Sequence, residues 1–141
     1  MKTSVLPKLN ENGELPPGEH ECEVHEIDSA FGSSNERRAH LMKGLKNALG
    51  NLGAAGVKRV FVDGSFTSDK AEPNDIDGCW DYEESVDIDL LDPVFLDESR
   101  SDMKKKYGVD FFLYLRSSRA TLVYRSHSFF RKIEMVSPKE F

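Results

Sequence analysis

The apolar residues in the second quarter of the chain follow a helical period. They recur at intervals of three and four residues and so form one apolar stripe. The stripe consists of Leu41, Leu45, Ala48, Leu49 and Leu52. Ser33 and Glu36 stand before it at capping-box spacing, and Gly53 and Gly56 are typical stop signals after it. The pattern therefore predicts a helix over roughly residues 35–54.

Shorter runs of β-branched and aromatic residues predict strands at residues 59–63, 75–82 and 109–115. Phe95 to Lys106 is predicted to be a helix that Gly108 ends. Toward the C-terminus we expect a helix around residues 118–131 and a short edge strand at residues 133–136. These elements predict an α/β (α+β) fold in which helices pack on a small mixed β-sheet.

The chain has 141 residues, the size of a single domain. Prolines and glycines punctuate its beginning, which predicts an extended arm with loops over residues 1–30 and one folded domain over residues 31–141. His20, Cys22 and His25 in the arm are possible metal ligands. Acidic residues interleave them and no second ligand pair follows, so a surface turn or short helix is the favoured interpretation over a zinc site.

A Gly-Ser pair, Gly64-Ser65, follows the first predicted strand, and two aspartates follow the pair after a spacer of nine residues. Side chains alternate along a strand, so Asp75 and Asp77 should point to one face while Ile76 points to the other. The turn offers backbone N–H groups to phosphate oxygens, and carboxylates are the ligands that Mg²⁺ prefers. The two halves of this pattern can therefore act on one substrate.

Each half also has an ordinary explanation. A strand-to-turn junction accounts for the Gly-Ser pair alone, and a solvated strand face accounts for the paired aspartates. Aspartate is poorly suited to strands, however. Asp110 stands within a strongly apolar strand, where an unpaired carboxylate is costly and a metal or cationic partner would remove that cost. Taken together, the residues favour a metal site.

This arrangement resembles the nucleotidyltransferase superfamily, which includes DNA polymerase beta, aminoglycoside nucleotidyltransferases and the minimal nucleotidyltransferases of toxin–antitoxin pairs. The superfamily pattern is an apolar residue, a Gly-Ser pair, a spacer and Asp-apolar-Asp, and Asp110 fits the place of a third carboxylate. The resemblance covers roughly residues 36–116 and is greatest to small bacterial members. Phe66-Thr67 departs from the arginine or small residue that often follows the pair.

The resemblance implies a Mg²⁺-dependent enzyme that moves a nucleoside monophosphate from a nucleoside triphosphate such as ATP onto a hydroxyl of a protein or an RNA. It also implies two Mg²⁺ ions and a toxin–antitoxin or defence context. The implied residues are Asp75, Asp77 and Asp110 for metal binding and catalysis, and Gly64, Ser65 and Lys70 for nucleotide binding.

The net charge of −6 is unevenly distributed. Residues 101–141 contain nine lysines and arginines and four acids, a net of +5, which leaves −11 for residues 1–100. A basic segment beside an acidic site suits a triphosphate or an acceptor, although uneven surface charge explains the numbers equally well. No apolar run approaches the roughly 20 residues of a membrane span. Two cysteines far apart in sequence favour reduced thiols, so the chain is predicted to be cytoplasmic.

A second class of function fits the same residues. A regulatory or antitoxin-like binding protein can keep such a fold without turnover, because fold does not determine activity. The short chain favours this alternative, since it leaves little room for an acceptor-binding domain. The intact Gly-Ser pair and the three aspartates favour an enzyme.

Overall fold

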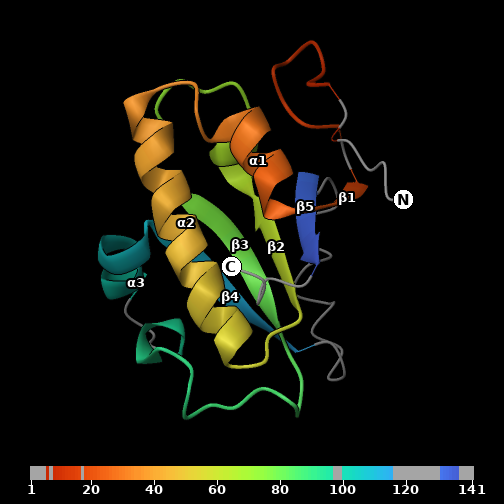
Figure 1. Ribbon diagram of the computed structural model, residues 1–141. Coiled ribbons are helices and arrows are strands. Elements are labelled where there is room, and N and C mark those ends of the chain that lie inside the picture. The colour runs from red at the N-terminus through yellow and green to blue at the C-terminus, as the bar shows by residue number, and fades with distance from the viewer. Residues whose placement is uncertain (1–5, 7, 17, 97–99, 116–130, 137–141) are drawn as a thin grey trace.

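A computed structural model describes residues 6, 8–16, 18–96, 100–115 and 131–136 (Figure 1). The strands form one five-stranded sheet in the order β1-β5-β2-β3-β4. Their bounds are β1 Gly18–Cys22, β2 Arg59–Asp63, β3 Ile76–Tyr82, β4 Val109–Leu115 and β5 Arg131–Val136. Strand β1 pairs with β5 in parallel, as β3 does with β4, and the other neighbours are antiparallel. The predicted mixed α/β fold is therefore confirmed.

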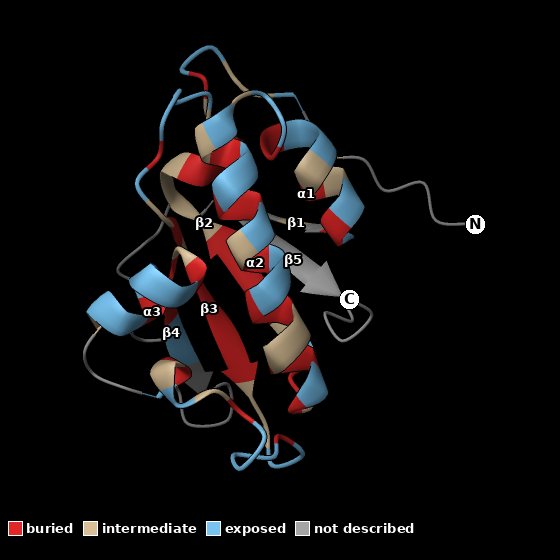
Figure 2. Ribbon diagram, turned by 60° about the vertical axis from the view of Figure 1, so that its left-hand side comes forward, coloured by how far each residue is buried: buried red, intermediate tan, exposed pale blue. Residues whose placement is uncertain are grey.

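The described helices lie on one face of this sheet (Figure 1). They are α1 Val24–Phe31, α2 Glu36–Ala54 and α3 Arg100–Tyr107, with the short 3-10 turns η1 Gly64–Thr67 and η2 Pro93–Phe95. Helix α2 turns a buried side to the sheet and an exposed side to solvent (Figure 2). Among the helices in the described ranges, none combines the length and the apolar character that a bilayer crossing needs.

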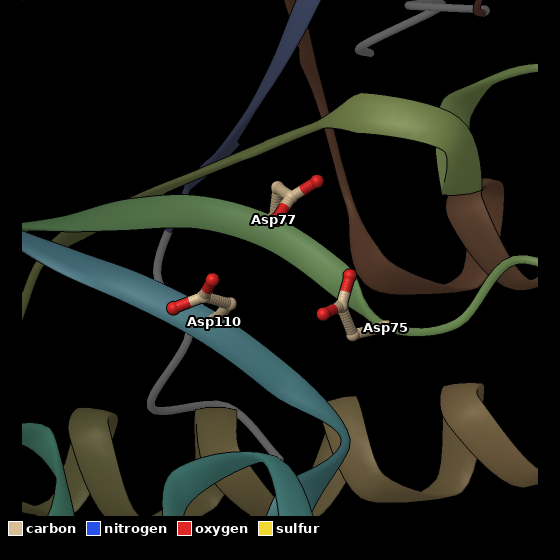
Figure 3. A group of neighbouring side chains, drawn as sticks. All are labelled: Asp75, Asp77 and Asp110. Carbon is tan, nitrogen blue, oxygen red and sulfur yellow. The ribbon is translucent and has the colours of Figure 1, made fainter. Parts of the chain in front are cut away.

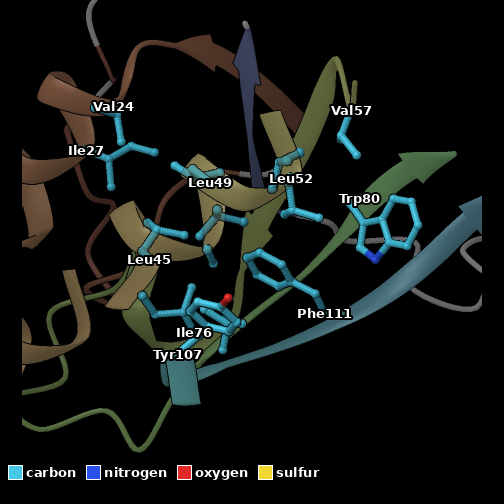
Figure 4. Close-up of a cluster of buried hydrophobic side chains, with 14 of the residues drawn as sticks. Val24, Ile27, Leu45, Leu49, Leu52, Val57, Ile76, Trp80, Tyr107 and Phe111 are labelled. Atoms are coloured by element: carbon cyan, nitrogen blue, oxygen red, sulfur yellow. The ribbon is translucent and has the colours of Figure 1, made fainter. Parts of the chain in front are cut away.

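The core lies between α2 and the sheet (Figure 4). Leu45, Leu49 and Leu52 from the predicted stripe are fully buried there. Trp80 of β3 and Phe111 of β4 join them from the sheet. Removing these side chains from water supplies the driving force that holds α2 on the sheet, and so leaves the opposite face of β3 and β4 for other chemistry.

The N-terminal segment differs from the extended arm predicted for residues 1–30, because it contains β1 and α1. Leu15 is fully buried, and its backbone N–H donates to the carbonyl of Thr67. Val24, Ile27 and Phe31 recur at helical spacing and bury one side of α1. That period was present in the sequence, and the neighbouring prolines and acidic residues obscured it.

The C-terminal half of the chain brings a second correction. Strand β5 is not an edge strand, since it lies between β1 and β2. The prediction failed because the segment that covers its outer side, β1, had been placed in the arm. The helix expected around residues 118–131 falls almost entirely outside the described residues, and position 131 begins β5. Helix α3 is confirmed in a shorter form, ending before Gly108, whose φ is 72°.

The start of α2 holds the loop that connects β2 to β3. Asn35, rather than the predicted Ser33, is the N-cap, and its side chain accepts a hydrogen bond from the backbone N–H of Arg38. Arg38 is only 3% exposed. Its guanidinium donates to the carbonyls of Phe31, Ser65, Phe66, Ser68 and Lys70. A buried cation normally needs a carboxylate partner, whereas here backbone carbonyl dipoles take that place.

The side chains next to Arg38 in sequence make similar hydrogen bonds to the end of the loop. Asn35 donates through its amide to the carbonyl of Ala71, at 2.7 Å. Arg37 donates to the carbonyls of Pro73 and Asn74, directly before Asp75. The first turn of α2 therefore fixes both the Gly-Ser turn and the approach to the aspartates.

We predict that Arg38→Met lowers the free energy of unfolding by about 3–5 kcal/mol, because buried carbonyls lose their donor. Urea denaturation followed by circular dichroism measures this. Lys43→Met on the exposed side of α2 is the matched control and should change stability by less than about 0.5 kcal/mol. Equal effects of the two substitutions would show that Arg38 does not anchor the loop.

Candidate metal and nucleotide site

Three aspartates form one row across neighbouring strands. Asp63 of β2 pairs in register with Asp77 of β3, and Asp77 pairs with Asp110 of β4. Asp75 directly precedes β3 and shares the face of Asp77. Figure 3 shows Asp75, Asp77 and Asp110 on the side of the sheet that faces away from α2. Like charges directly opposite each other destabilise a sheet, so this row needs positive charge near it.

The three carboxylates predicted as ligands do converge. Asp75, Asp77 and Asp110 each offer one oxygen, and these oxygens lie within 4.8 Å of one another. All three residues are partly buried. Oxygen donors with room for water molecules are what Mg²⁺ requires. The donor set therefore fits a hard divalent cation.

Asp110 retains an unused acceptor. Its Oδ1 is buried and has no hydrogen-bond partner in the described part of the chain, although Nε of Arg100 lies 2.6 Å away. This contact is an ion pair without hydrogen-bond alignment. The charge of Arg100 compensates part of the free-energy cost of burying this oxygen without a hydrogen bond, and a bound cation would compensate the rest. The orphaned oxygen is thus a second feature of the site that fits a metal.

Helix α3 supplies the positive charge. Nζ of Lys104 lies 3.3 Å from Oδ2 of Asp75 and 3.7 Å from Oδ2 of Asp110. The hydrogen bond to Asp75 and the nearby carboxylates raise the pKa of Lys104, so the ammonium stays charged. Lys106, by contrast, pairs with Asp92 at 2.5 Å. Lys104 is therefore the residue of this lysine run that contacts Asp75 and Asp110.

Asp77 lies among the other carboxylates of the site and is partly buried, and both conditions disfavour its charged form. Burial, followed by the charges of Asp75, Asp110 and Asp63, raises the pKa of Asp77 from 3.8 to about 6, and Lys104 opposes this only weakly. A carboxylate held among other carboxylates favours its protonated form. Metal binding requires the deprotonated form, so affinity for a cation should rise with pH through about 6.

The Gly-Ser turn lies directly beside Asp77. Gly64 begins η1 with a φ of 86°, and a Cβ at this position would lie 2.3 Å from Oδ2 of Asp77. Glycine is therefore required both for the backbone conformation and for the close approach. Ser65 follows, and its carbonyl accepts from Arg38 and from the hydroxyl of Ser68. The structure thus brings the predicted turn and the predicted carboxylates together.

A protein-family profile matches residues 7–139, nearly the whole chain. The chain belongs to DUF6932, a family of unknown function. Comparisons with curated proteins and with solved structures gave no match. For this DUF6932 member, the function must therefore be argued from the site itself.

The structure also places Lys70 and several residues that the sequence prediction did not name. Lys70 is exposed; its backbone carbonyl accepts from Arg38, and its backbone N–H donates to the hydroxyl of Ser68. Lys104 occupies the position beside the carboxylates. Arg38 and Asp63 were also missed, although Arg38 stands three residues before Leu41 on the apolar stripe, which was a readable signal of burial.

The alternative metal ligands near the N-terminus do not converge. Cys22 is buried in β1, and His25 is exposed, with Nε2 3.1 Å from Glu23. His20 contacts the carbonyl of Pro16. Within the described ranges, the group of three aspartates is the cluster of possible ligands that the structure contains. The surface turn or short helix favoured for this segment is correct only for His25, which lies in α1, because His20 and Cys22 belong to strand β1.

We predict that Asp77→Asn stabilises the metal-free protein at pH 7 by about 1–2 kcal/mol. The size of the effect follows from the raised pKa of Asp77, and solvent screening of this partly exposed side chain reduces it. Because the pKa of Asp77 is raised to about 6 in the folded state, the folded protein binds more protons than the unfolded chain between about pH 4 and 6. The wild type therefore loses stability over that range as pH rises.

Urea denaturation in EDTA at pH 4 and pH 7 checks this. The advantage of Asp77→Asn should be small at pH 4 and full at pH 7. Asp87→Asn, on an exposed loop, is the control and should show no such trend. A variant that is less stable than wild type at pH 7 would mean that Asp77 is structural.

Proposed function

We propose that this chain is a Mg²⁺-dependent nucleotidyltransferase that transfers a nucleoside monophosphate from a nucleoside triphosphate to a protein or RNA hydroxyl. The observation that carries the proposal is the convergence of three carboxylate oxygens within 4.8 Å, beside a glycine turn with positive φ. The motif resemblance of the Gly-Ser pair and the Asp-x-Asp pair supports the same activity.

Asp75, Asp77 and Asp110 would hold the metal. Two bound Mg²⁺ ions would neutralise the triphosphate and lower the pKa of the attacking hydroxyl. The orphaned Oδ1 of Asp110 and the raised pKa of Asp77 both describe carboxylates that gain from a cation. The site therefore suits Mg²⁺ in two respects, namely its carboxylate oxygen ligands and its negative charge.

In the proposed reaction, the acceptor oxygen attacks the α-phosphorus, and a new P–O bond forms. The bond between the α-phosphorus and the oxygen bridging to the β-phosphorus breaks, and pyrophosphate leaves with that electron pair. The hydroxyl proton would pass to a base, and Asp110 is the candidate because its Oδ1 is ion-paired with Arg100 but accepts no hydrogen bond within the described residues. The base then releases the proton to solvent. No oxidation state changes in this reaction.

The Gly-Ser turn would bind the phosphates. Gly64 keeps the backbone close to Asp77 without a side chain between them. Backbone N–H groups in such a turn can donate to phosphate oxygens, and the Ser65 hydroxyl can add one more hydrogen bond. Arg38 makes the turn rigid, which reduces the ordering cost of binding.

The setting of the activity is part of the proposal. A cytoplasmic location would supply nucleoside triphosphates and Mg²⁺, and the resemblance to minimal nucleotidyltransferases suggests a toxin–antitoxin or defence role. A non-catalytic, regulatory protein would bind the nucleotide without transferring it. Measuring binding and transfer together therefore distinguishes an enzyme from a regulatory protein.

We predict that incubation with each α-labelled nucleoside triphosphate, Mg²⁺ and a lysate labels a macromolecule. Asp75→Asn with Asp77→Asn should lose both calorimetric binding of the Mg-nucleotide and transfer. Asp110→Ala should lose transfer by about 100-fold or more while keeping nucleotide binding within a few-fold, because its main effect is on the reacting hydroxyl.

The exposed Asp87 and Asp89 form a second Asp-x-Asp pair on a loop and provide the matched control. Their double Asn variant should retain binding and transfer. Nucleotide binding without any labelling across all four triphosphates would favour the regulatory alternative. Absence of Mg-nucleotide binding would contradict the site.

A further inference from the structure

Two cations of α3 stand on the β4 side of the aspartates. Arg100 and Lys104 are four residues apart, so they share one side of the helix. Arg100 lies 2.6 Å from Asp110, and Lys104 bridges Asp75 and Asp110. Helix α3 therefore presents both charges at one border of the site.

An exposed aromatic ring continues this border. Phe112 follows Asp110 by two residues on β4 and so shares its face of the sheet. It is 54% exposed, and Cζ of Arg100 lies 3.8 Å from the centre of its ring. Nη2 of Arg100 is buried and has no hydrogen-bond partner among the residues that the structure describes. We refer to Arg100, Lys104 and Phe112 as the β4 platform.

The β4 platform and the Gly-Ser turn lie on opposite sides of Asp77. Gly64 follows β2 and approaches Asp77 from that side, whereas Asp110 and Phe112 belong to β4 on the other side. If the triphosphate lies at the Gly-Ser turn, the β4 platform is left for the second substrate.

The charges of the site make this platform dependent on metal. Asp63, Asp75, Asp77 and Asp110 provide four negative charges, and Arg100 and Lys104 provide two positive charges, so the metal-free site is negative by two. Two divalent cations would reverse that balance to positive by two. They would also release Arg100 and Lys104 from the carboxylates, leaving both free to bind other anions.

We propose that the acceptor is single-stranded RNA, whose terminal base stacks on Phe112 and whose last phosphate binds Arg100 and Lys104. This rests on the proposed nucleotidyltransferase function and deepens it by naming the acceptor. A paired arginine and lysine beside an exposed ring combine phosphate binding with base stacking, as single-strand binders do.

Fluorescence anisotropy with a labelled RNA of about ten nucleotides, bearing a free 3′ hydroxyl, tests this. Affinity should rise when Mg²⁺ replaces EDTA, opposite to the usual competition of Mg²⁺ with protein cations for phosphates. Phe112→Ala should weaken binding about tenfold, and Phe112→Tyr should keep it. Lys104→Gln should weaken binding and reduce the salt slope by about one.

Leu113→Ala and Lys105→Gln are the matched controls, because both residues are exposed neighbours outside the β4 platform. Each should bind RNA as the wild type does, and thermal melts should show all variants folded. Equal binding by all folded variants, weaker binding in Mg²⁺, or a preference for DNA of the same sequence would overturn the RNA assignment.

Calorimetry with Mg-ATP on the same samples separates this inference from the proposed function. Phe112→Ala should bind Mg-ATP normally. If Mg-ATP binding is intact and substitutions in the β4 platform leave RNA binding unchanged, the RNA inference is wrong while the proposed nucleotidyltransferase function is not affected. Labelling that protease removes and ribonuclease does not would identify a protein acceptor and also overturn it.

Discussion

The buried guanidinium of Arg38 is the interaction on which the site depends. It draws the carbonyls of Ser65 and Phe66 in the turn, and of Ser68 and Lys70 beyond it, onto the first turn of α2. Beyond η1, the loop between β2 and β3 forms an isolated β-bridge from Ser68 to Glu14 but no helix or strand, so its remaining carbonyls need a central donor. Burial lowers the pKa of Arg38, and the charge of Asp69 opposes that shift. Rigid backbone around Gly64 is the consequence.

The aspartate row beside this loop destabilises the folded state. Asp63, Asp77 and Asp110 repel one another across neighbouring strands. Burial, followed by the charges of Asp75, Asp110 and Asp63, raises the pKa of Asp77. A chain under selection for stability alone would place apolar or alternating charges there. Arg100 and Lys104 offset part of the repulsion. Stability given up at one position of a sheet is typical of functional sites, where a ligand supplies the missing interaction.

Local patterns predicted the elements with strong periodicity, and contacts across the chain decided the rest. The stripe of α2 and the alternation around Ile76 placed that helix and the carboxylate face correctly. Strand β1 was missed because its residues carry no strand pattern, and pairing with β5 defines it. In the sequence, Lys104 was one of nine cations counted in residues 101–141, because a run of lysines does not reveal which one meets Asp75. Only the packing of α3 beside β4 makes that choice.

The central claim is that Asp75, Asp77 and Asp110 bind a divalent metal and that the ammonium group of Lys104 moves away from Asp75 when the metal binds. A crystal soaked with Mn²⁺ and a non-hydrolysable ATP analogue tests both parts through anomalous scattering from the metal. The account predicts manganese between Asp75, Asp77 and Asp110, phosphates at Gly64, and Nζ of Lys104 moved away from Asp75. Manganese bound elsewhere, or an intact Lys104–Asp75 contact beside a bound nucleotide, would contradict it.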